Sequence, residues 1–196
     1  MKRILIVAGL SGMLIPALAS AELDYNAVTA GFTSTMNGNN AANFTELSLG
    51  FTKSTSKNVY LGASYEAGRQ PSTAIGVADK KVHSISLGAG FHTPLNDDVD
   101  AIVAGHIVQG STITAGNNAS ANGYDIGAGV RAQFPNGLEG SITAVLASTS
   151  NGTYSTTDTY VNTQFGFDFT PEIQLYAGID LFRDNQTMDF GMRFFF

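Results

Sequence analysis

Residues 186–196, Gln-Thr-Met-Asp-Phe-Gly-Met-Arg-Phe-Phe-Phe, alternate without a break and end the chain on an aromatic side chain. The apolar positions of one parity are Met188, Phe190, Met192, Phe194 and Phe196, and the positions between them are mostly small, polar or charged. A strand has a period of two, so this stretch predicts a β-strand with one wholly apolar face. In a barrel that spans a membrane, the apolar face meets lipid and the polar face lines the lumen.

The amino end of the chain has the pattern of an export signal. A basic start, Lys2 and Arg3, is followed by a largely apolar stretch over 4–18 and by small residues at 19–21. This pattern predicts a cleavable signal peptide over 1–21 and a mature chain over 22–196 that forms one domain. The alternative, an uncleaved anchor, is disfavoured because the apolar run is shorter than the ~20 residues that a spanning helix needs.

Composition excludes several classes of function. The formal net charge is −6, and a nucleic-acid partner is not expected because such binding needs a concentrated basic surface. The chain has no cysteine, which removes disulfides, thiol nucleophiles and thiolate metal sites. No cofactor is expected.

Turn signals recur along the mature chain and predict repeated hairpins. Short turns are expected at 54–58, 93–98, 135–137 and 170–172, and longer polar segments at 36–43, 69–80, 109–123, 148–158 and 183–185. Short periplasmic turns and longer extracellular loops are typical of an outer-membrane barrel. We therefore predict an all-β fold: a single antiparallel up-and-down transmembrane β-barrel of ten strands, with eight strands as the alternative. The strands are expected near 23–35, 44–53, 58–68, 81–93, 99–108, 124–134, 138–147, 159–169, 173–182 and 186–196. In the first of these neither parity is clean, which a bulge or a late-closing seam would explain.

The inner faces that this alternation predicts are rich in carboxylates. Six acids and two arginines are expected to face the lumen: Glu46, Glu66, Asp125, Asp168, Asp180, Asp189, Arg131 and Arg193. If water runs through the lumen, this excess of negative charge favours cations. If the lumen is plugged, the two arginines pair with neighbouring carboxylates and the other acids are hydrated or hydrogen-bonded. Both interpretations stay open at this stage.

The signal peptide, the hairpins and the final Met-Asp-Phe-Gly-Met-Arg-Phe-Phe-Phe resemble the small outer-membrane β-barrel proteins of Gram-negative bacteria, the family that includes OmpA-type and OmpX-type barrels. This resemblance implies a location in the outer membrane and contact with its lipids. It also implies that the barrel-assembly machinery reads the carboxy-terminal signal, Phe190, Met192, Phe194 and Phe196. Members of that group are structural anchors, surface-interaction proteins, narrow pores or, in a few lineages, lipid-modifying enzymes.

An enzyme is not expected, because the chain shows no convergent nucleophile, base and orienting acid. The three histidines are His83, His92 and His106, and His83 and Ser84 should point to opposite faces of their strand. No spacing typical of metal ligands occurs, so a metal is not expected either. Chance placement in the wall and lumen is the favoured interpretation of all three.

The outer segments favour a role at the cell surface. Residues 109–123 and 148–157 are uncharged and small, which suits contact with an extracellular ligand or host surface, although mere hydrophilic connectors would look the same. Four basic residues fall at the expected outer rim, where lipopolysaccharide phosphates lie: Arg69, Lys80, Lys81 and Arg183. The hypothesis from sequence is a monomeric structural or surface-interaction barrel. The alternative is a narrow cation-preferring, porin-like pore, and a membrane-embedded lipid-modifying enzyme is the least favoured of the three. A soluble barrel that binds an apolar ligand conflicts with the polar inner face.

Overall fold

The computed structural model describes residues 25–37, 44–71, 79–115, 117–134, 137–182 and 185–196. These residues form ten antiparallel strands: β1 (Ala27–Asn37), β2 (Phe44–Ser56), β3 (Val59–Gln70), β4 (Lys80–Asn96), β5 (Val99–Thr114), β6 (Asn117–Phe134), β7 (Leu138–Ser150), β8 (Ser155–Thr170), β9 (Ile173–Leu181) and β10 (Asn185–Phe195). The expected signal peptide over 1–21 lies outside the described residues. In the described part of the chain, no helix is long and apolar enough to cross a membrane.

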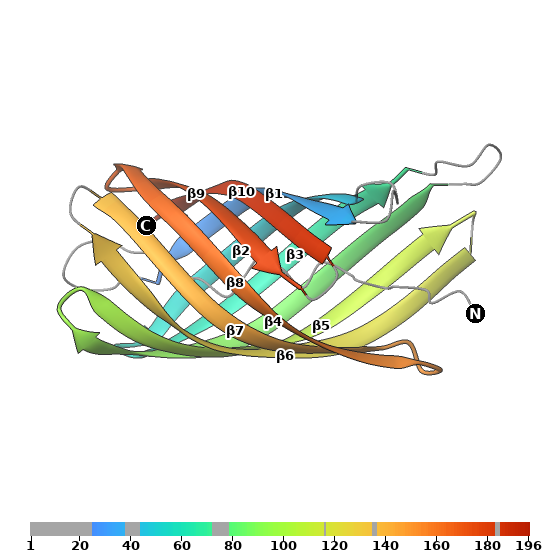
Figure 1. Ribbon diagram of the computed structural model, residues 1–196, viewed down its shortest axis with the longest axis horizontal. Helices are drawn as coiled ribbons and strands as arrows, with labels where there is room; N and C mark the ends of the chain where they lie inside the picture. Colours follow the sequence, from blue (N-terminus) through green and yellow to red (C-terminus); the bar gives the residue numbers. More distant parts are fainter. Residues whose placement is uncertain (1–24, 38–43, 72–78, 116, 135–136, 183–184) are drawn as a thin grey trace.

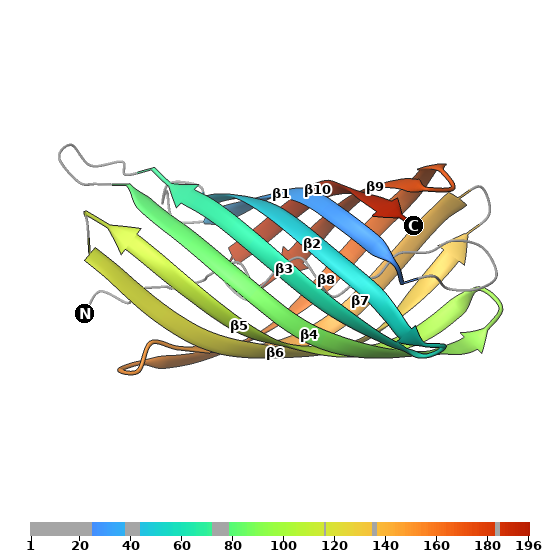
Figure 2. The ribbon, with the colours of Figure 1, turned by 180° about the vertical axis from the view of Figure 1, so that it is seen from behind.

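The strands form a closed barrel in which each pairs with its neighbours in sequence and β1 closes the ring against β10. Ala27 pairs with Phe195 across this seam, so both ends of the described chain lie at the same end of the barrel. Figures 1 and 2 show the strands tilted around the barrel's long axis, with the carboxy terminus at one end. The prediction of an up-and-down barrel with ten strands is confirmed, and the eight-strand alternative is wrong.

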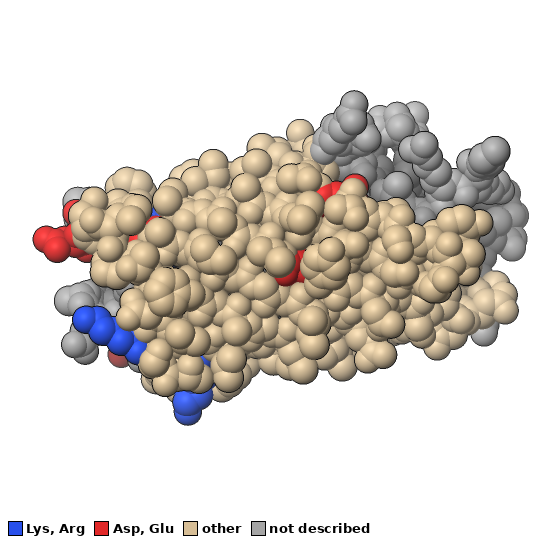
Figure 3. All heavy atoms as spheres, turned by 90° about the horizontal axis from the view of Figure 1, so that it is seen from below, with Lys and Arg blue, Asp and Glu red and all other residues tan. Residues whose placement is uncertain are grey.

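Side chains alternate between an apolar outer wall and a polar interior. Leu47, Ile107 and Phe165 are 65%, 66% and 63% exposed on the outside of the barrel. The side chains buried on the inside are mostly polar or charged, and they include Glu46, Asp125, Arg131 and Gln174. A barrel with this arrangement is built for a lipid exterior, because in water the apolar residues would be inside. Figure 3 shows one face of the wall, where the broad band between the ends carries no Lys or Arg colour.

Short connections join consecutive strands at one end of the barrel. Between β2 and β3, between β4 and β5 and between β8 and β9 only two residues separate the strands. These are the short periplasmic turns that the sequence predicts, and the register shifts of the sheet lie beside them. We call the opposite end the outer end.

The structure corrects the expected outer loops. Residues 109–123 were predicted as a long loop, but β5 continues to Thr114 and β6 begins at Asn117, so most of this segment is a paired β-ribbon. The predicted loop over 148–158 is likewise shortened, because β7 reaches Ser150 and β8 starts at Ser155. Above the membrane neither face of a strand meets lipid, so these residues lack the apolar alternation by which the other strands are recognised.

The first strand also differs from expectation. β1 begins at Ala27, and its pairs with both β2 and β10 run in unbroken register, so no bulge interrupts it. Val28 and Phe32 face outward, while Thr33 and Thr35 are buried inside. In the sequence, the alternation of this strand looked unclear because its other outward-facing positions carry small or polar side chains instead of large apolar ones.

Candidate functional site

The lumen is the part of the molecule where charged side chains from many strands come together. Its periplasmic half holds both inward-facing arginines, and strand register sets their positions. Arg131 of β6 pairs with Asp100 of β5 and Ser141 of β7, while Arg193 of β10 pairs with Gln174 of β9. Alternation directs all of these side chains inward at one level of the barrel.

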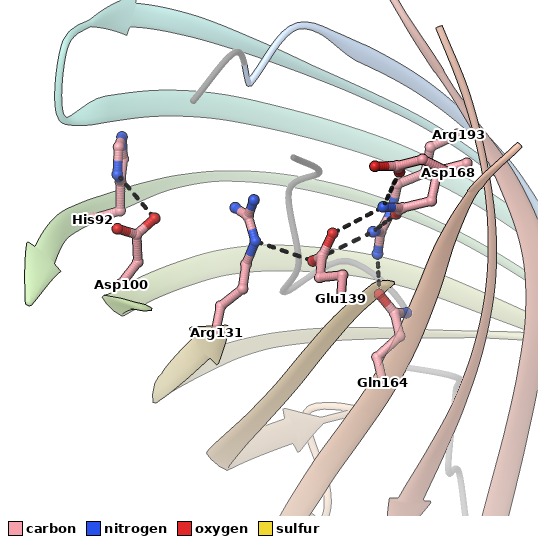
Figure 4. A network of polar contacts seen from close by, with 8 residues as sticks. His92, Asp100, Arg131, Glu139, Gln164, Asp168 and Arg193 are labelled. Carbon is pink, nitrogen blue, oxygen red and sulfur yellow. Dashed lines mark hydrogen bonds and ion pairs between the residues drawn. The ribbon is translucent and has the colours of Figure 1, made fainter. Parts of the chain in front are cut away.

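Glu139 on β7 is the centre of this level. Its Oε1 lies 3.0 Å from Nε of Arg131 and 3.9 Å from Nη1 of Arg193, and its Oε2 accepts a hydrogen bond of 2.9 Å from Nε2 of Gln174. The contact with Arg131 is an ion pair rather than an aligned hydrogen bond. One carboxylate therefore lies between two guanidinium groups from different strands, as Figure 4 shows.

Amide and carboxylate groups extend this network around the wall. Arg193 donates through Nη1 to Oε1 of Gln174 at 2.5 Å and through Nη2 to Oε1 of Gln164. Gln174 also donates to Oδ1 of Asp168 at 2.8 Å. Polar groups in a barrel interior need such partners, because each unpaired one costs free energy.

Tyr25 reaches across the same level from the opposite wall. Its ring stacks on Tyr60 at a centroid distance of 4.8 Å and lies 4.1 Å from the ring of His92. The Cζ of Arg131 is 5.9 Å from the Tyr25 ring centroid. Tyr25 precedes β1, which is five strands from β6 in either direction around the ring, so its side chain extends into the lumen toward Arg131.

The backbone next to Tyr25 is tied to the barrel wall. The backbone N–H of Tyr25 donates to Oγ of Ser54 at 3.3 Å, and the N–H of Ser54 donates to Oδ1 of Asn26 at 3.2 Å. These bonds hold Tyr25 at the periplasmic mouth. We call Tyr25, Arg131, Glu139, Gln174 and Arg193 together the periplasmic bridge.

The outer half of the lumen carries most of the acids. Glu66 accepts from Ser84 at 2.9 Å, Asp125 lies 2.8 Å from Nδ1 of His106, and Asp180 accepts from Asn162 at 2.6 Å. Glu46 and Asp189 are buried on the same inner face. This half of the lumen is therefore more negative than the periplasmic half, where arginines offset the carboxylates.

The structure places all eight sequence-predicted lumen residues on the inner face but divides them between the two levels. Arg131, Asp168 and Arg193 belong to the periplasmic level, and the other five lie toward the outer end. Of these five, Asp189 connects the two levels, because it accepts a hydrogen bond of 3.3 Å from Gln164, which itself accepts from Arg193. Sequence reasoning missed Glu139 and Asp100. Glu139 could have been found, because the outward parity of Leu138 and Ile142 makes its own position inward.

The histidines fall on both sides of the wall. His92 and His106 face inward. Nδ1 of His92 lies 3.8 Å from Asp100, and His106 pairs with Asp125. His83 faces outward and Ser84 inward, on opposite faces of β4 as predicted. Nδ1 of His83 is 3.0 Å from the hydroxyl of Tyr65. Among the described residues, no group of three or more His, Asp or Glu is placed to hold a metal ion.

The four basic residues expected at the rim do not form one set. Arg69 and Lys81 are exposed on outward positions, and Nε of Arg69 donates to Asp79 at 2.8 Å. Lys80 lies on the inward parity of β4 and interacts with Glu46, so it does not face the lipid as we expected. Arg183 lies outside the described residues.

The side chains of the expected assembly signal all face outward on β10. Phe190, Met192, Phe194 and Phe196 form the outer face of this strand, and the ring of Phe196 lies 6.0 Å from that of Phe51 on β2. Recognition of these residues by the assembly machinery stays a prediction.

Comparison with known proteins identifies the fold and nothing narrower. No family model matches the chain, and no curated protein does. Among solved structures, the NanC porin is 9% identical with a TM-score of 0.54, and the alignment covers 86% of this chain and 100% of that one. A bacterial polysaccharide outer membrane secretin is 10% identical with a TM-score of 0.51, covering 86% of this chain and 69% of that one. The KdgM porin, 9% identical over 86% of this chain and 99% of that chain, has a TM-score of 0.49. The chain thus has the fold of bacterial outer-membrane β-barrels, and its lipid-facing wall agrees with a location in the outer membrane. A specific kinship with OmpA-type or OmpX-type barrels stays a prediction.

Proposed function

We propose that this protein is a closed outer-membrane barrel that works through its outer surface and not by passing solutes. The observation that carries the proposal is the contact between Tyr25 and Arg131, which joins opposite walls of the lumen. Arg131 also forms an ion pair with Glu139, and Glu139 in turn contacts Gln174 and Arg193. An ion moving through the lumen would have to break these contacts.

The ribbon formed by the outer parts of β5 and β6 supports a role at the surface. The lipid-facing wall of these strands ends at the pair Ile107 and Tyr124, and paired residues continue to Thr114 and Asn117. Seven further cross-strand pairs at about 3.4 Å each extend the ribbon by roughly 24 Å along the strand. Its side chains are mainly hydroxyls and amides, which suit hydrogen bonds to a partner in water.

Removal of the ribbon tests this role. A two-residue Asn-Gly turn can join Val108 directly to Gly123, because these residues are cross-strand partners. We expect cells that display the trimmed barrel to lose adherence to one another and to a solid support, while the barrel still assembles. A matched control replaces 151–154, the turn between β7 and β8, by the same dipeptide. Equal adherence of trimmed and full-length barrels would contradict the surface role.

A narrow cation-preferring pore is the second candidate, and the acidic outer level favours it. Glu46, Glu66, Asp125, Asp180 and Asp189 would attract cations into the outer half if the periplasmic bridge opened. In planar bilayers, Glu66→Gln with Asp189→Asn should then reduce the preference for cations over anions. Unchanged selectivity in conducting channels would remove this candidate.

A further inference from the structure

The outward-facing basic residues at the outer end of the barrel lie on two neighbouring strands. Of the lysines and arginines in the described ranges, only Arg69 of β3 and Lys81 of β4 face outward at this end. Lys53 and Lys57 lie beside the β2–β3 turn at the periplasmic end. Among the residues that the structure describes, the basic side chains of the outer rim therefore lie on one side of the barrel.

Arg69 and Lys81 are direct cross-strand partners. Like charges directly opposite one another destabilise a sheet unless an anion offsets them. Asp79 pairs with Arg69, so this carboxylate offsets one of the two charges. The whole chain has a formal net charge of −6, so a local excess of positive charge is unusual for it. An anionic ligand between Arg69 and Lys81 would complete the charge balance.

His83 adds a hydrogen-bonding group to the same patch. It lies two positions from Lys81 on the same face of β4, toward the membrane. Nδ1 of its ring is 3.0 Å from the Tyr65 hydroxyl, and the two rings are stacked at 6.3 Å. This contact fixes the ring and makes Nε2 the ring nitrogen with which His83 can meet a ligand.

The height of the patch identifies the kind of ligand. On β4 the next outward residues below His83 are Ile85 and Leu87, which are 54% and 53% exposed to lipid. The patch thus begins where the apolar wall ends, at the level of the outer-leaflet headgroups. Phosphate groups are the anions of this layer, and arginine and lysine are the side chains that bind them.

We propose that Arg69, Lys81 and His83, with Tyr65 positioning the histidine, bind a phosphate group of lipopolysaccharide on the outside of β3 and β4. The site is independent of the lumen. The site includes His83 and leaves out Lys80, which the sequence analysis expected at the rim but which lies on the inward parity of β4. Phosphate binding at this site anchors one side of the barrel to the outer leaflet.

Titration of the folded, detergent-solubilised mature barrel with bisphosphorylated lipid A tests this site. We expect Lys81→Gln and His83→Gln each to weaken binding by about tenfold, since a hydrogen bond to a charged group contributes about 1.5 kcal/mol or more. Lys81→Arg should retain binding, and Tyr65→Phe should weaken it less than His83→Gln does. The matched controls, Lys53→Gln and Lys57→Gln, should bind as the unsubstituted barrel does. Unchanged affinity in the Lys81→Gln, His83→Gln double variant would overturn the proposal.

The chemical source of the phosphate is tested with three further probes. Dephosphorylated lipid A should bind the unsubstituted barrel and the double variant equally weakly. Phosphatidylglycerol and inorganic phosphate should fail to displace bisphosphorylated lipid A. Displacement by either at similar concentration would overturn the assignment to lipopolysaccharide. Folding of each variant is checked by the shift of its gel mobility on heating, and none of these substitutions should alter conductance.

Discussion

At the scale of single residues, Glu139 has the largest share of the interactions in the periplasmic bridge. It is buried between Arg131 and Arg193 and accepts from Gln174, so three side chains depend on it. Removing one member of a buried ion pair leaves the partner's charge without compensation. The effect should therefore exceed that of a surface charge.

We predict that Glu139→Gln lowers the free energy of unfolding by about 3 kcal/mol. Urea unfolding of the barrel in lipid vesicles measures this change. Asp97→Asn, on the exposed turn between β4 and β5, is the control and should change stability by less than about 0.5 kcal/mol. A loss for Glu139→Gln no larger than that of the control would show that the bridge contributes nothing to stability.

Gly129 of β6 is required by close packing against the neighbouring strand. A Cβ at this position would overlap the carbonyl oxygen of Ile142, and it would lie 2.6 Å from Oγ1 of Thr143. The backbone atom cannot move without disturbing the sheet. At Gly62 of β3, by contrast, a Cβ would meet Cγ2 of Thr52 at 3.6 Å, an ordinary contact.

We therefore predict that Gly129→Ala destabilises the barrel by about 1–3 kcal/mol, the usual range for overpacking. Gly62→Ala should be tolerated, with a change below about 1 kcal/mol. Thermal unfolding of both variants provides the comparison. Equal midpoints for the two variants would count against the packing at Gly129.

Sequence alternation predicts which way a residue points but not what it touches across the lumen. Arg131 and Arg193 could be assigned to the inner face because large apolar residues occupy the positions of opposite parity on their strands. The contact of Arg131 with Tyr25 could not be predicted, because it depends on how far β1 and β6 are displaced relative to each other around the ring. Tyr25 also precedes β1, where alternation gives no signal.

At the scale of elements, the number of strands could be predicted from the sequence. A strand gives a clear alternating pattern wherever one of its faces meets lipid. The boundaries of β9, Ile173–Leu181, differ from the expected 173–182 by one residue. The largest error concerns β6, Asn117–Phe134, whose first seven residues were assigned to a loop. Asn, Ser and Gly in 117–123 have low strand propensity, and pairing with β5 overrides it. Between β5 and β6, Ala115 has a φ of 51°, in the left-handed region, which an alanine does not signal in the sequence.

The last strand combines a structural and a predicted sorting role. Phe196 follows β10 at the periplasmic end, where its ring lies 6.0 Å from that of Phe51 and its N–H donates to the carbonyl oxygen of Asn26 at 3.2 Å. We predict that deletion of Phe196 lowers the amount of barrel assembled in cells several-fold, while refolding of the purified chain in detergent is unaffected. Phe196→Tyr should behave like the unchanged chain. The measurement is the heat-modifiable fraction in outer membranes and in refolded samples, and parallel losses in both would indicate a stability effect instead of a sorting signal.

At the scale of the whole molecule, the barrel is uneven in both height and charge. β4 to β8 include the long strands, whereas β9 has 9 residues and β1 and β10 have 11 each, so one side of the outer rim is taller. The carboxylates of the lumen gather toward the outer half, and the arginines cross the periplasmic half. In the function that we propose, the periplasmic bridge is the barrier that closes the lumen of this barrel.

Conductance of the mature barrel in a planar bilayer with a salt gradient tests this barrier most directly. The unsubstituted barrel should give no stable current steps. The variant that combines Tyr25→Ala and Arg131→Ala should conduct with a preference for cations, and Tyr154→Ala, an exposed outer residue, should stay silent. Stable steps from the unsubstituted barrel, or a silent bridge variant that is correctly folded, would contradict a lumen closed by the periplasmic bridge.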